Sequence, residues 1–503
     1  MGYATVYTRS SMGVKAPQVT VEIHLANGIP SFSLIGLVEA SVRESKERVR
    51  SAIIHSGFEF PAKRIVINLA PADLPKQGGR FDLAIAIGIL VASEQVSANL
   101  LDQFEFLGEL SLSGDLRPVA AILPATLAIA PSSRQLIVAN ANLTEALLYK
   151  VQESKGADNL LQVTQYLNQQ GTLESEPPTM DQSSLTQQLA LSDVIGQQQA
   201  KRALIIAASG FHNLLMVGPP GTGKSMLARR ISALLPPMTD QEAIETASVY
   251  SVLGQFEASK HWCQRPFRSP HHSASISALV GGGSNPQPGE ISMAHNGVLF
   301  LDELPEFGRA ALDTLREPLE TGDVQISRAK AKVEFPANFQ LIAAMNPSPT
   351  GDLEDQRVSV EQIMRYLSRL SGPLLDRIDL QVEVQRQPLQ LISLASDEFS
   401  SSSKVRDRIS QLHELQRKRQ ACLNAQLTST QLAQYCSLNA ADQQFFVECL
   451  EKFNASHRAM HRFLRVARTI ADWENSRDIQ RHHLAEAISY RALDTLIRQF
   501  TPC

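Results

Sequence analysis

Near the middle of the chain stands Leu214-Leu215-Met216-Val217-Gly218-Pro219-Pro220-Gly221-Thr222-Gly223-Lys224-Ser225. A short apolar run leads into a glycine-rich loop, and a helical pattern from Met226 to Leu235 follows it. Strand, loop and helix in this order are the context that a Walker A loop requires. Glycines let backbone N–H groups approach phosphate oxygens closely, and the start of the helix adds partial positive charge. The stretch therefore predicts a nucleotide-binding domain with a parallel sheet.

The residue types of this loop also predict the cofactors. Lys224 is expected to reach the β and γ phosphates, and Ser225 to ligate magnesium. The expected cofactors are thus ATP and Mg²⁺. The predicted cofactor-binding run is Gly218, Pro219, Pro220, Gly221, Thr222, Gly223, Lys224, Ser225 and Met226.

A second apolar run, Val298–Leu301, has no polar alternation, which indicates a strand buried on both faces of a parallel sheet. Asp302 and Glu303 stand at its carboxyl end, where open α/β sheets place ligands. Asp302 is expected to hold magnesium, directly or through water, and Glu303 to orient and polarise the attacking water. An acidic turn after a core strand is the plainer interpretation, and the upstream loop argues against it.

A third apolar run, Phe339–Met345, ends at Asn346, which is expected to sense the γ-phosphate or the attacking water. Phosphoryl transfer also needs a cation on the transferring group, often from a neighbouring subunit. Arg377 is the first candidate, and Arg458 is the second, in cis or in trans. Arg365 and Arg369 are rivals, and any single arginine is more often a solvated surface charge.

The length of 503 residues predicts two to four domains. Residues 1–167 alternate β-rich runs (Val19–His24, Ile65–Leu69, Leu136–Ala139) with helical patterns (Glu39–Ser56, Phe81–Ser93), which is typical of an α/β domain. Residues 168–188 are polar and are expected to be a linker. Residues 189–385 form the predicted nucleotide-binding core. Residues 386–503 carry apolar side chains at helical spacing, as in Phe463, Val466, Ala467 and Ile470, and predict an all-helical domain.

The composition narrows the location and the partners. A net charge of -4, from 47 Lys+Arg and 51 Asp+Glu, provides no global attraction to nucleic acid, so any DNA contact must come from local basic stripes. Five scattered cysteines are typical of a reducing cytosol. Met1–Lys15 lacks the pattern of a signal peptide, and the longest apolar run, Leu83–Ala92, is about half of what a bilayer requires. A cytoplasmic protein without membrane contact is expected.

Beyond these motifs, the chain resembles the ComM/YifB family, AAA+ ATPases related to the ATPase subunit of magnesium chelatase. The matching strings run over nearly the whole chain and are Asn68-Leu69-Ala70-Pro71-Ala72-Asp73-Leu74-Pro75-Lys76, Arg268-Ser269-Pro270-His271-His272, Pro288-Gly289-Glu290-Ile291-Ser292-Met293-Ala294-His295 and Val466-Ala467-Arg468-Thr469-Ile470-Ala471-Asp472.

The resemblance implies a fold: a Lon-protease-like α/β domain, an AAA+ core with insertions before the Val298–Leu301 and Phe339–Met345 strands, and a helical lid. It also implies a ring, a hexamer, that migrates branches in recombining DNA during natural transformation. The implied partners are single-stranded or branched DNA and other recombination proteins. Within the ring, the resemblance supports Arg377 as a finger acting in trans and Arg458 as the sensor of the lid.

Two departures from the related patterns matter. Family members often carry a cysteine-rich stretch after the sensor asparagine, whereas Asn346–Gly351 has no cysteine, so no zinc site is expected there. The serine of a Lon protease would fall near Arg80, and its lysine near Leu123 or Ala125. Without a hydroxyl nucleophile and an amine base that mechanism has no chemistry. The first domain is therefore expected to bind or assemble and not to cut.

Two segments are candidates for contact with DNA. Asp323–Phe335 carries Arg328, Lys330 and Lys332 at every second position, which on one β-strand places all three cations on one face, where they can follow phosphates. The resemblance places this segment in a hairpin facing the pore; a solvated hairpin face is the alternative. Arg268–His295, with Gly281–Gly283 at its expected tip, is interpreted as a mobile pore loop. It includes His271 and His272, which lack a third ligand at zinc-like spacing.

Three functions follow from these observations. The leading hypothesis is a DNA-translocating ATPase that drives branch migration or strand separation. The first alternative is a chelatase-type motor that acts on a separate metal-insertion subunit. The second is an ATP-dependent protease or unfoldase, against which the missing nucleophile argues.

Overall fold

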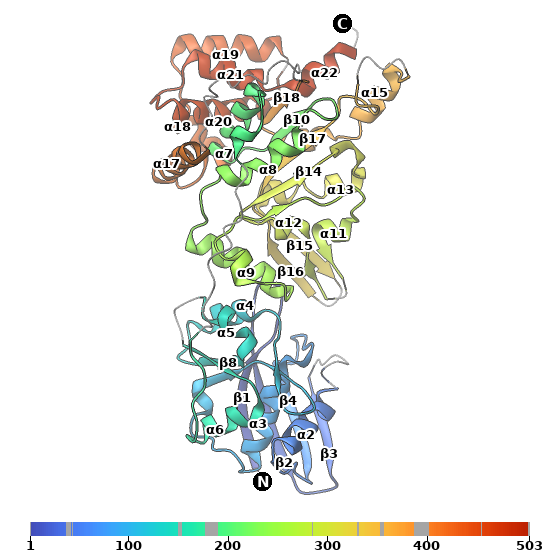
Figure 1. Ribbon diagram of the computed structural model, residues 1–503, viewed down its shortest axis with the longest axis vertical. Helices are drawn as coiled ribbons and strands as arrows, with labels where there is room; N and C mark the ends of the chain where they lie inside the picture. The colour runs from blue at the N-terminus through green and yellow to red at the C-terminus, as the bar shows by residue number, and fades with distance from the viewer. Residues whose placement is uncertain are drawn as a thin grey trace.

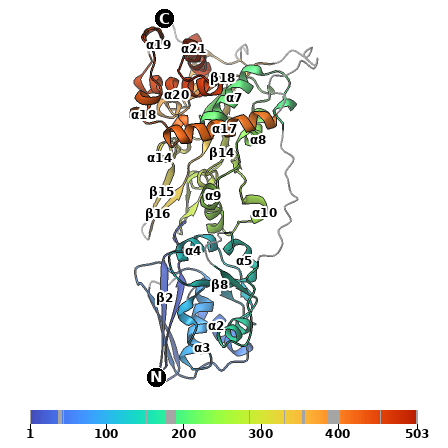
Figure 2. The same cartoon turned by 90° about the vertical axis from the view of Figure 1, so that its left-hand side faces the viewer.

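The computed structural model describes residues 2–36, 42, 44–148, 153–176, 190–283, 285–328, 331–352, 357–386, 402–453 and 455–500. Three bodies follow one another along the long axis of the molecule: an α/β domain at the amino-terminal end, a central sheet, and a group of helices at the other end (Figure 1). Seen from the side, helix α9 (Asp240–Val252) and the hairpin β15–β16 lie between the first body and the central sheet (Figure 2). The predicted mixed α/β class with a helical carboxyl-terminal part is confirmed.

The amino-terminal domain is a seven-stranded sheet in the order β3-β4-β2-β1-β5-β8-β9. Strands β1, β2 and β4 are antiparallel neighbours, and the other pairs are parallel. Every residue of helix α3 is buried against this sheet, which explains its almost wholly apolar sequence. The elements are β1 Gly2–Arg9, β2 Gln18–Ala26, β3 Ser31–Ile35, α2 Ser45–His55, β4 Arg64–Ala70, α3 Asp82–Ala92, β5 Phe104–Phe106, α4 Ile122–Ile129, β8 Gln135–Ala139, α5 Asn140–Ala146, β9 Ser154–Ala157 and α6 Leu160–Leu167.

These elements confirm the three β-rich runs and the helix expected over Phe81–Ser93. Of the helix expected over Glu39–Ser56, α2 is present, and residues 37–41 and 43 lie outside the described part of the chain. The first residues of the expected linker still adjoin the domain, because Gly156 N donates to Glu174 O at 2.8 Å. Residues 177–189 are not described.

The central sheet has five parallel strands in the order β11-β14-β17-β10-β18. Alternate side chains of β10 enter two different cores: Leu214 and Met216 pack with helices α7 and α8, and Leu215 and Val217 pack on the opposite face. This two-sided burial is why β10 and β14 read as unbroken apolar runs. The elements are α7 Gln198–Gly210, β10 Leu214–Val217, α8 Lys224–Leu234, β11 Phe267–Arg268, β14 Val298–Leu301, β17 Gln340–Met345 and β18 Leu380–Glu383.

Two insertions leave this sheet. The first contains short helices and a small antiparallel pair in which Gly281 faces Pro288, and the second is the antiparallel hairpin β15–β16. Helix α10 Ala258–His261 precedes β11. The elements that follow are α11 Ile276–Val280, β12 Gly281–Gly282, β13 Gln287–Pro288 and α12 Glu290–Met293 before β14, and α13 Arg309–Asp313, α14 Pro318–Thr321, β15 Asp323–Arg328 and β16 Ala331–Pro336 after it. Helices α15 Val360–Leu367 and α16 Gly372–Leu375 precede β18.

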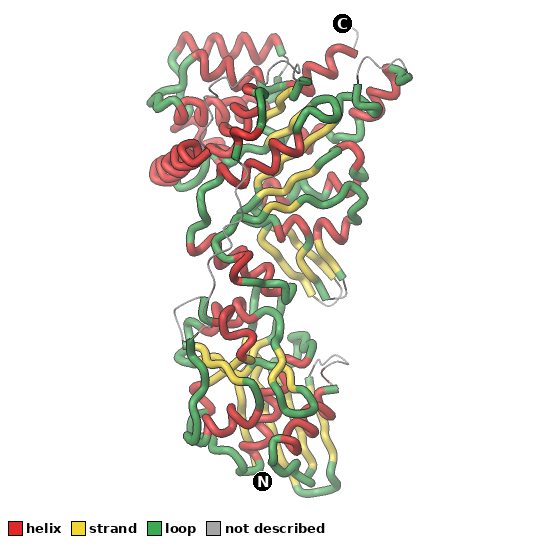
Figure 3. The backbone as a smooth tube through the Cα atoms, in the orientation of Figure 1, coloured by secondary structure: helices red, strands yellow, loops and turns green. Residues whose placement is uncertain are grey.

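The carboxyl-terminal part is helical (Figure 3). Helix α20 buries the predicted stripe Phe463, Val466, Ala467 and Ile470 in the same core as α7 and α8, so the helices form a lid on one face of the sheet. The elements are α17 Ser402–Gln420, α18 Ser429–Tyr435, α19 Ala440–Lys452, α20 His457–Trp473, α21 Arg481–Ser489 and α22 Ala492–Phe500. None of the helices in the described ranges is both long and apolar enough to cross a membrane.

In the part of the chain that the structure describes, the first domain contacts the core through Ser251 of α9 and through the loop between β1 and β2. Backbone N–H groups of Ala121 and Leu123 donate to Ser251 of α9, at 2.8 Å to its carbonyl and 3.3 Å to its hydroxyl. Met12 and Val14, in the loop between β1 and β2, pack against the core that contains the hairpin. Gly13 between them has φ +59°, and a Cβ there would lie 2.4 Å from Val333 Cγ1. Only glycine therefore allows this approach to the hairpin.

Candidate nucleotide site

The loop between β10 and α8 has the backbone shape of a phosphate cradle. Gly221 and Gly223 have φ values of +78° and +91°, and an added Cβ at either would meet no atom within 4 Å. The requirement for glycine is thus conformational and not steric. Helix α8 begins at Lys224 without a side-chain hydrogen bond at its cap, which leaves N–H groups of its first turn for an anion.

Lys224 lies inside this loop. Its Nζ donates to Gly218 O at 2.7 Å, to Pro219 O at 2.8 Å and to Asn346 Oδ1 at 3.2 Å. Burial lowers the pKa of Lys224, and the nearby carboxylates of Asp302 and Glu303 oppose that shift. The amine is therefore held where phosphate oxygens would replace its carbonyl partners, with the predicted sensor Asn346 beside it.

Ser225 and Asp302 form the oxygen pair that a magnesium ion needs. Ser225 Oγ donates to Asp302 Oδ2 at 2.6 Å, across the gap between α8 and the end of β14. Hydroxyl and carboxylate oxygens are hard ligands of the kind that Mg²⁺ prefers, and Mg²⁺ takes few of them from protein when phosphates supply others. The residues present fit the ion.

Glu303 is in an unusual backbone conformation and has a partner that the sequence did not reveal. Its φ of +52° and ψ of +46° are left-handed, a state that costs about 1–3 kcal/mol for a residue other than glycine and often marks a functional turn. Its carboxylate pairs with His272 Nδ1 at 3.0 Å. His272 comes from the first insertion, which follows β11, the strand next to β14. The interpretation of Arg268–His295 as a mobile pore loop, with no metal site at His271 and His272, did not anticipate this contact.

Arg377 and Arg458 lie at the other edge of the sheet. Both line a cavity of about 820 Å³ together with Asn213, Asp323 and Asn338, residues that precede or begin strands. Arg377 Nη1 donates to Pro373 O at 3.0 Å and the guanidinium pairs with Glu320; Arg458 Nη1 lies 3.8 Å from Asp376 Oδ2. The Walker A loop is at the carboxyl ends of the strands, so the two arginines lie at the edge of the sheet opposite that loop.

The two rival arginines are on the α15 side. Arg369 Nη1 donates to Pro305 O at 3.1 Å and to Glu306 Oε2 at 2.9 Å, directly after the acidic pair. Arg365 is exposed on α15. Arg369 thus lies close to the end of β14 in its own chain, whereas Arg377 lies at the opposite edge of the sheet.

The hairpin corrects the prediction that three cations share one face. Arg328 ends β15 and pairs with Ala331, whereas Lys332 lies on β16 and pairs with Ser327. Cross-strand partners share a face, so positions 328 and 332 fall on opposite faces. Lys332 is on the exposed face. The prediction was wrong because Arg328 and Lys332 lie on two antiparallel strands and not on one strand. Lys330 lies outside the described residues.

The positions compared with a Lon protease are all buried. Arg80 is 7% exposed, and burial lowers its pKa to about 10. Leu123 and Ala125 lie on α4 and are fully buried. None of these positions presents a nucleophile or an amine to a substrate.

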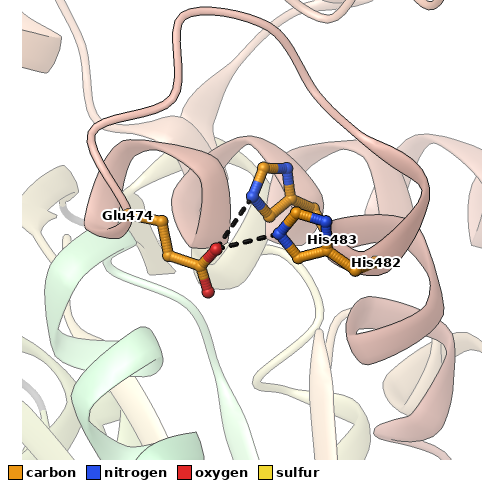
Figure 4. Close-up of side chains that lie close together, drawn as sticks. All are labelled: Glu474, His482 and His483. Atoms are coloured by element: carbon orange, nitrogen blue, oxygen red, sulfur yellow. Dashed lines mark hydrogen bonds and ion pairs between the residues drawn. The ribbon is translucent and has the colours of Figure 1, made fainter.

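One cluster of potential metal ligands occurs among the described residues, at Glu474, His482 and His483 (Figure 4). Glu474 Oε2 lies 2.9 Å from His482 Nε2 and 3.1 Å from His483 Nε2. However, Gln480 N–H donates to His483 Nδ1 at 2.9 Å, so the neutral ring carries its proton on Nε2 and has no lone pair there for a metal.

The cluster is explained instead as a link between lid and core. Arg202 on α7 contacts Glu474 Oε1 at 3.2 Å and Glu486 Oε1 at 2.9 Å. Burial opposes ionisation of Glu474, but hydrogen bonds from His482 and His483 outweigh it and lower the pKa of Glu474. The carboxylate is thereby kept charged for Arg202.

Comparisons with known proteins agree with this architecture. The family model described as magnesium chelatase, subunit ChlI, matches residues 190–392. Models described as subunit ChlI of Mg-chelatase and as the ChlI C-terminal part match residues 21–142 and 399–491.

Individual relatives are similar over the whole length. A Haemophilus influenzae protein named competence protein ComM is 54% identical, with 100% of both chains covered. The uncharacterized protein YifB of Escherichia coli is 52% identical over 99% of this chain and 98% of its own. The magnesium-chelatase 38 kDa subunit of Cereibacter sphaeroides is 27% identical over 39% of this chain and 58% of its own. The chain therefore belongs to the ComM/YifB family of magnesium-chelatase-like AAA+ ATPases.

Proposed function

We propose that this chain hydrolyses Mg·ATP within a ring of identical subunits, a hexamer, and uses that energy to move branched or single-stranded DNA during recombination and natural transformation. The observation that carries the proposal is the division of the catalytic residues between two edges of one sheet. Lys224, Ser225, Asp302, Glu303 and Asn346 meet at the carboxyl edge, and Arg377 lies at the amino edge with Arg458.

Each residue of the carboxyl edge has a defined task. Backbone N–H groups of the loop bind phosphates, and Lys224 exchanges its two carbonyl partners for phosphate oxygens. Ser225 and Asp302 would hold magnesium, which would neutralise charge that develops on the phosphates. Glu303, once released from His272, orients the attacking water, and Asn346 positions it from the other side.

The arginines support assembly. A guanidinium acting on the transferring phosphoryl group must lie beside it. Since Arg377 and Arg458 lie at the far edge of their own sheet, a second copy must present them to this nucleotide. A closed ring of head-to-tail contacts is the arrangement that pairs opposite edges in every subunit.

The hairpin supports DNA as the substrate. Lys332 stands on its exposed face, and Arg328 and Lys330 are close to it in sequence. The relative named competence protein ComM covers the full chain, which favours a role in DNA uptake and recombination.

The first domain, interpreted as Lon-like, touches the hairpin through Met12 and Val14 and is proposed to support assembly without cutting protein. The scattered cysteines favour a cytoplasmic location.

The second candidate is a chelatase-type motor that acts on a partner metal-insertion subunit. Three family models described as parts of a magnesium chelatase subunit favour it. The motor core is common to both candidates, so the substrate must decide between them.

The deciding experiment measures ATP hydrolysis with and without single-stranded and branched DNA, with Lys224→Ala as the blank. Stimulation by branched DNA supports the DNA motor. Hydrolysis that no DNA stimulates supports the chelatase-type motor. A purified protein that neither binds nor hydrolyses ATP with magnesium refutes both.

A further inference from the structure

The guanidinium of Arg377 is already occupied in this chain. It forms an ion pair with Glu320 of α14, and the side chain of Arg377 is 12% exposed. We propose that Glu320 is a positioning residue for Arg377: it holds the finger in its own chain and ties the release of that finger to movement of the hairpin β15–β16. The proposal rests on the function proposed above, in which Arg377 acts on the nucleotide of a neighbouring subunit.

The pairing is selective. Four other carboxylates line the same cavity, and three of them have different partners: Asp379 pairs with His212, Asp376 with Arg458 and Glu245 with His295. The fourth is Asp323 at the start of β15, whereas the guanidinium of Arg377 pairs with Glu320. Among the described residues that line the cavity, the carboxylate that pairs with the Arg377 guanidinium is therefore that of Glu320.

The main chain of Arg377 is fixed, so only its side chain can move. Its carbonyl accepts from Asn213 Nδ2 at 2.8 Å, next to the start of β10. Nη1 donates to Pro373 O at 3.0 Å, and buried Nε has no hydrogen-bond partner among the described residues. The guanidinium thus has unused hydrogen-bonding capacity, and the charge that opposes its departure is the Glu320 carboxylate.

Glu320 moves with the base of the hairpin. It stands on the last turn before Gly322, whose φ of +78° turns the chain into β15. Thr321 Oγ1 donates to Asp323 O at 3.2 Å, and Ala337 N donates to Gly322 O at 2.7 Å, which closes the hairpin base. A load on the hairpin is therefore transmitted to the residue next to Glu320.

The expected effect on ATP hydrolysis follows because Glu320 and the phosphate of a neighbouring subunit compete for the guanidinium of Arg377. For Arg377 to reach a phosphate on another subunit, it must first leave Glu320. The Glu320 side chain is 58% exposed, so solvent screens the pair. Removal of such a partner is expected to raise the rate of ATP hydrolysis without DNA about fivefold. A factor of this size corresponds to the upper end of the free energy that an exposed ion pair contributes.

The test uses full-length Glu320→Gln, which keeps the side-chain shape and removes the charge. The expected result is a kcat without DNA about fivefold higher, an unchanged KM for ATP, and a correspondingly smaller stimulation by DNA. Glu317→Gln is the matched control: it removes the same charge from an exposed side chain one turn earlier and is expected to leave the rate unchanged.

Two outcomes would overturn the proposal. One is a Glu320→Gln rate equal to or below wild type while its thermal unfolding matches that of Glu317→Gln. The other is an increase that persists in Arg377→Ala, because the effect would then not pass through the finger. A wild-type rate in the single variant Arg377→Ala refutes the assignment of the finger, and with it the proposed function. This result differs from both outcomes above, so failure of the proposed function can be told apart from failure of the role of Glu320.

Discussion

Two inactive variants should restore hydrolysis when they share a ring. Lys224→Ala removes the phosphate-binding amine but keeps the finger, and Arg377→Ala removes the finger but keeps the Walker A loop. The two groups lie at opposite ends of β10: Asn213, before the strand, contacts Arg377, and Gly218, after it, accepts from Lys224. Four strand residues separate these ends by about 13 Å, and the guanidinium faces Glu320 on its own edge.

The magnitudes follow from this separation. Loss of an arginine finger typically costs about a thousandfold or more in turnover, while ATP binding should be retained because Arg377 does not contact its own loop. In an equal mixture, a competent interface needs an intact loop from one subunit and an intact finger from the next. The intact loop and the intact finger are each present with a chance of one half, so about a quarter of the interfaces are active. This fraction holds for a ring of any size if its interfaces act independently.

The assay is steady-state hydrolysis after the purified variants have been mixed and allowed to exchange subunits. Wild type mixed equally with either variant is the control, and it should retain about half of the wild-type rate, since one of the two required groups is then always intact. A mixture no more active than its two components, in samples that pass the control, would refute a finger acting in trans. Full activity of Arg377→Ala alone would show that another arginine, such as Arg369, supplies the cation.

Three further predictions concern other parts of the molecule. His272→Ala removes the partner 3.0 Å from Glu303 and should raise hydrolysis without DNA a few fold with unchanged ATP binding; an unaltered kcat would show that the pair has no role in turnover. His413 is buried with its Nε2 against Ala208 O, and burial lowers its pKa to about 4. Below about pH 6.5 this histidine is therefore protonated in the unfolded chain but stays neutral in the folded chain. Stability should therefore fall by about 2 kcal/mol from pH 7 to pH 5, and urea unfolding of His413→Gln, which can still donate to Ala208, should lack that decrease; equal decreases in both proteins would contradict the assignment. Changing Arg328, Lys330 and Lys332 together to Ala should weaken DNA binding and lower its salt dependence by about one unit of slope for each phosphate that is no longer neutralised, as measured by titration at several salt concentrations. Binding identical to wild type at every salt concentration would exclude the hairpin from the DNA path.

Sequence alone was sufficient for the parts of the site that are local. The Walker A loop is a contiguous run in which each glycine meets a backbone requirement, and Gly221 and Gly223 have the positive φ values that require it. The three strands that end just before Gly218, Asp302 and Asn346 were readable because burial on both faces leaves no polar alternation. Helix α20 was readable from its apolar stripe.

Tertiary structure decided everything that depends on which strands become neighbours and on where the chain turns. The order β11-β14-β17-β10-β18 places His272 beside Glu303 and Asn346 beside Lys224, although chain order contains no sign of either pairing. Arg377 is close in sequence to β18, yet only the direction of the strands shows that it lies at the edge away from the nucleotide. The antiparallel pairing of Arg328 with Ala331 and of Ser327 with Lys332 likewise divides a basic pattern between two faces. A periodic pattern reports the local backbone, whereas these relations are set by long-range packing of the sheet, which no short stretch of residues encodes.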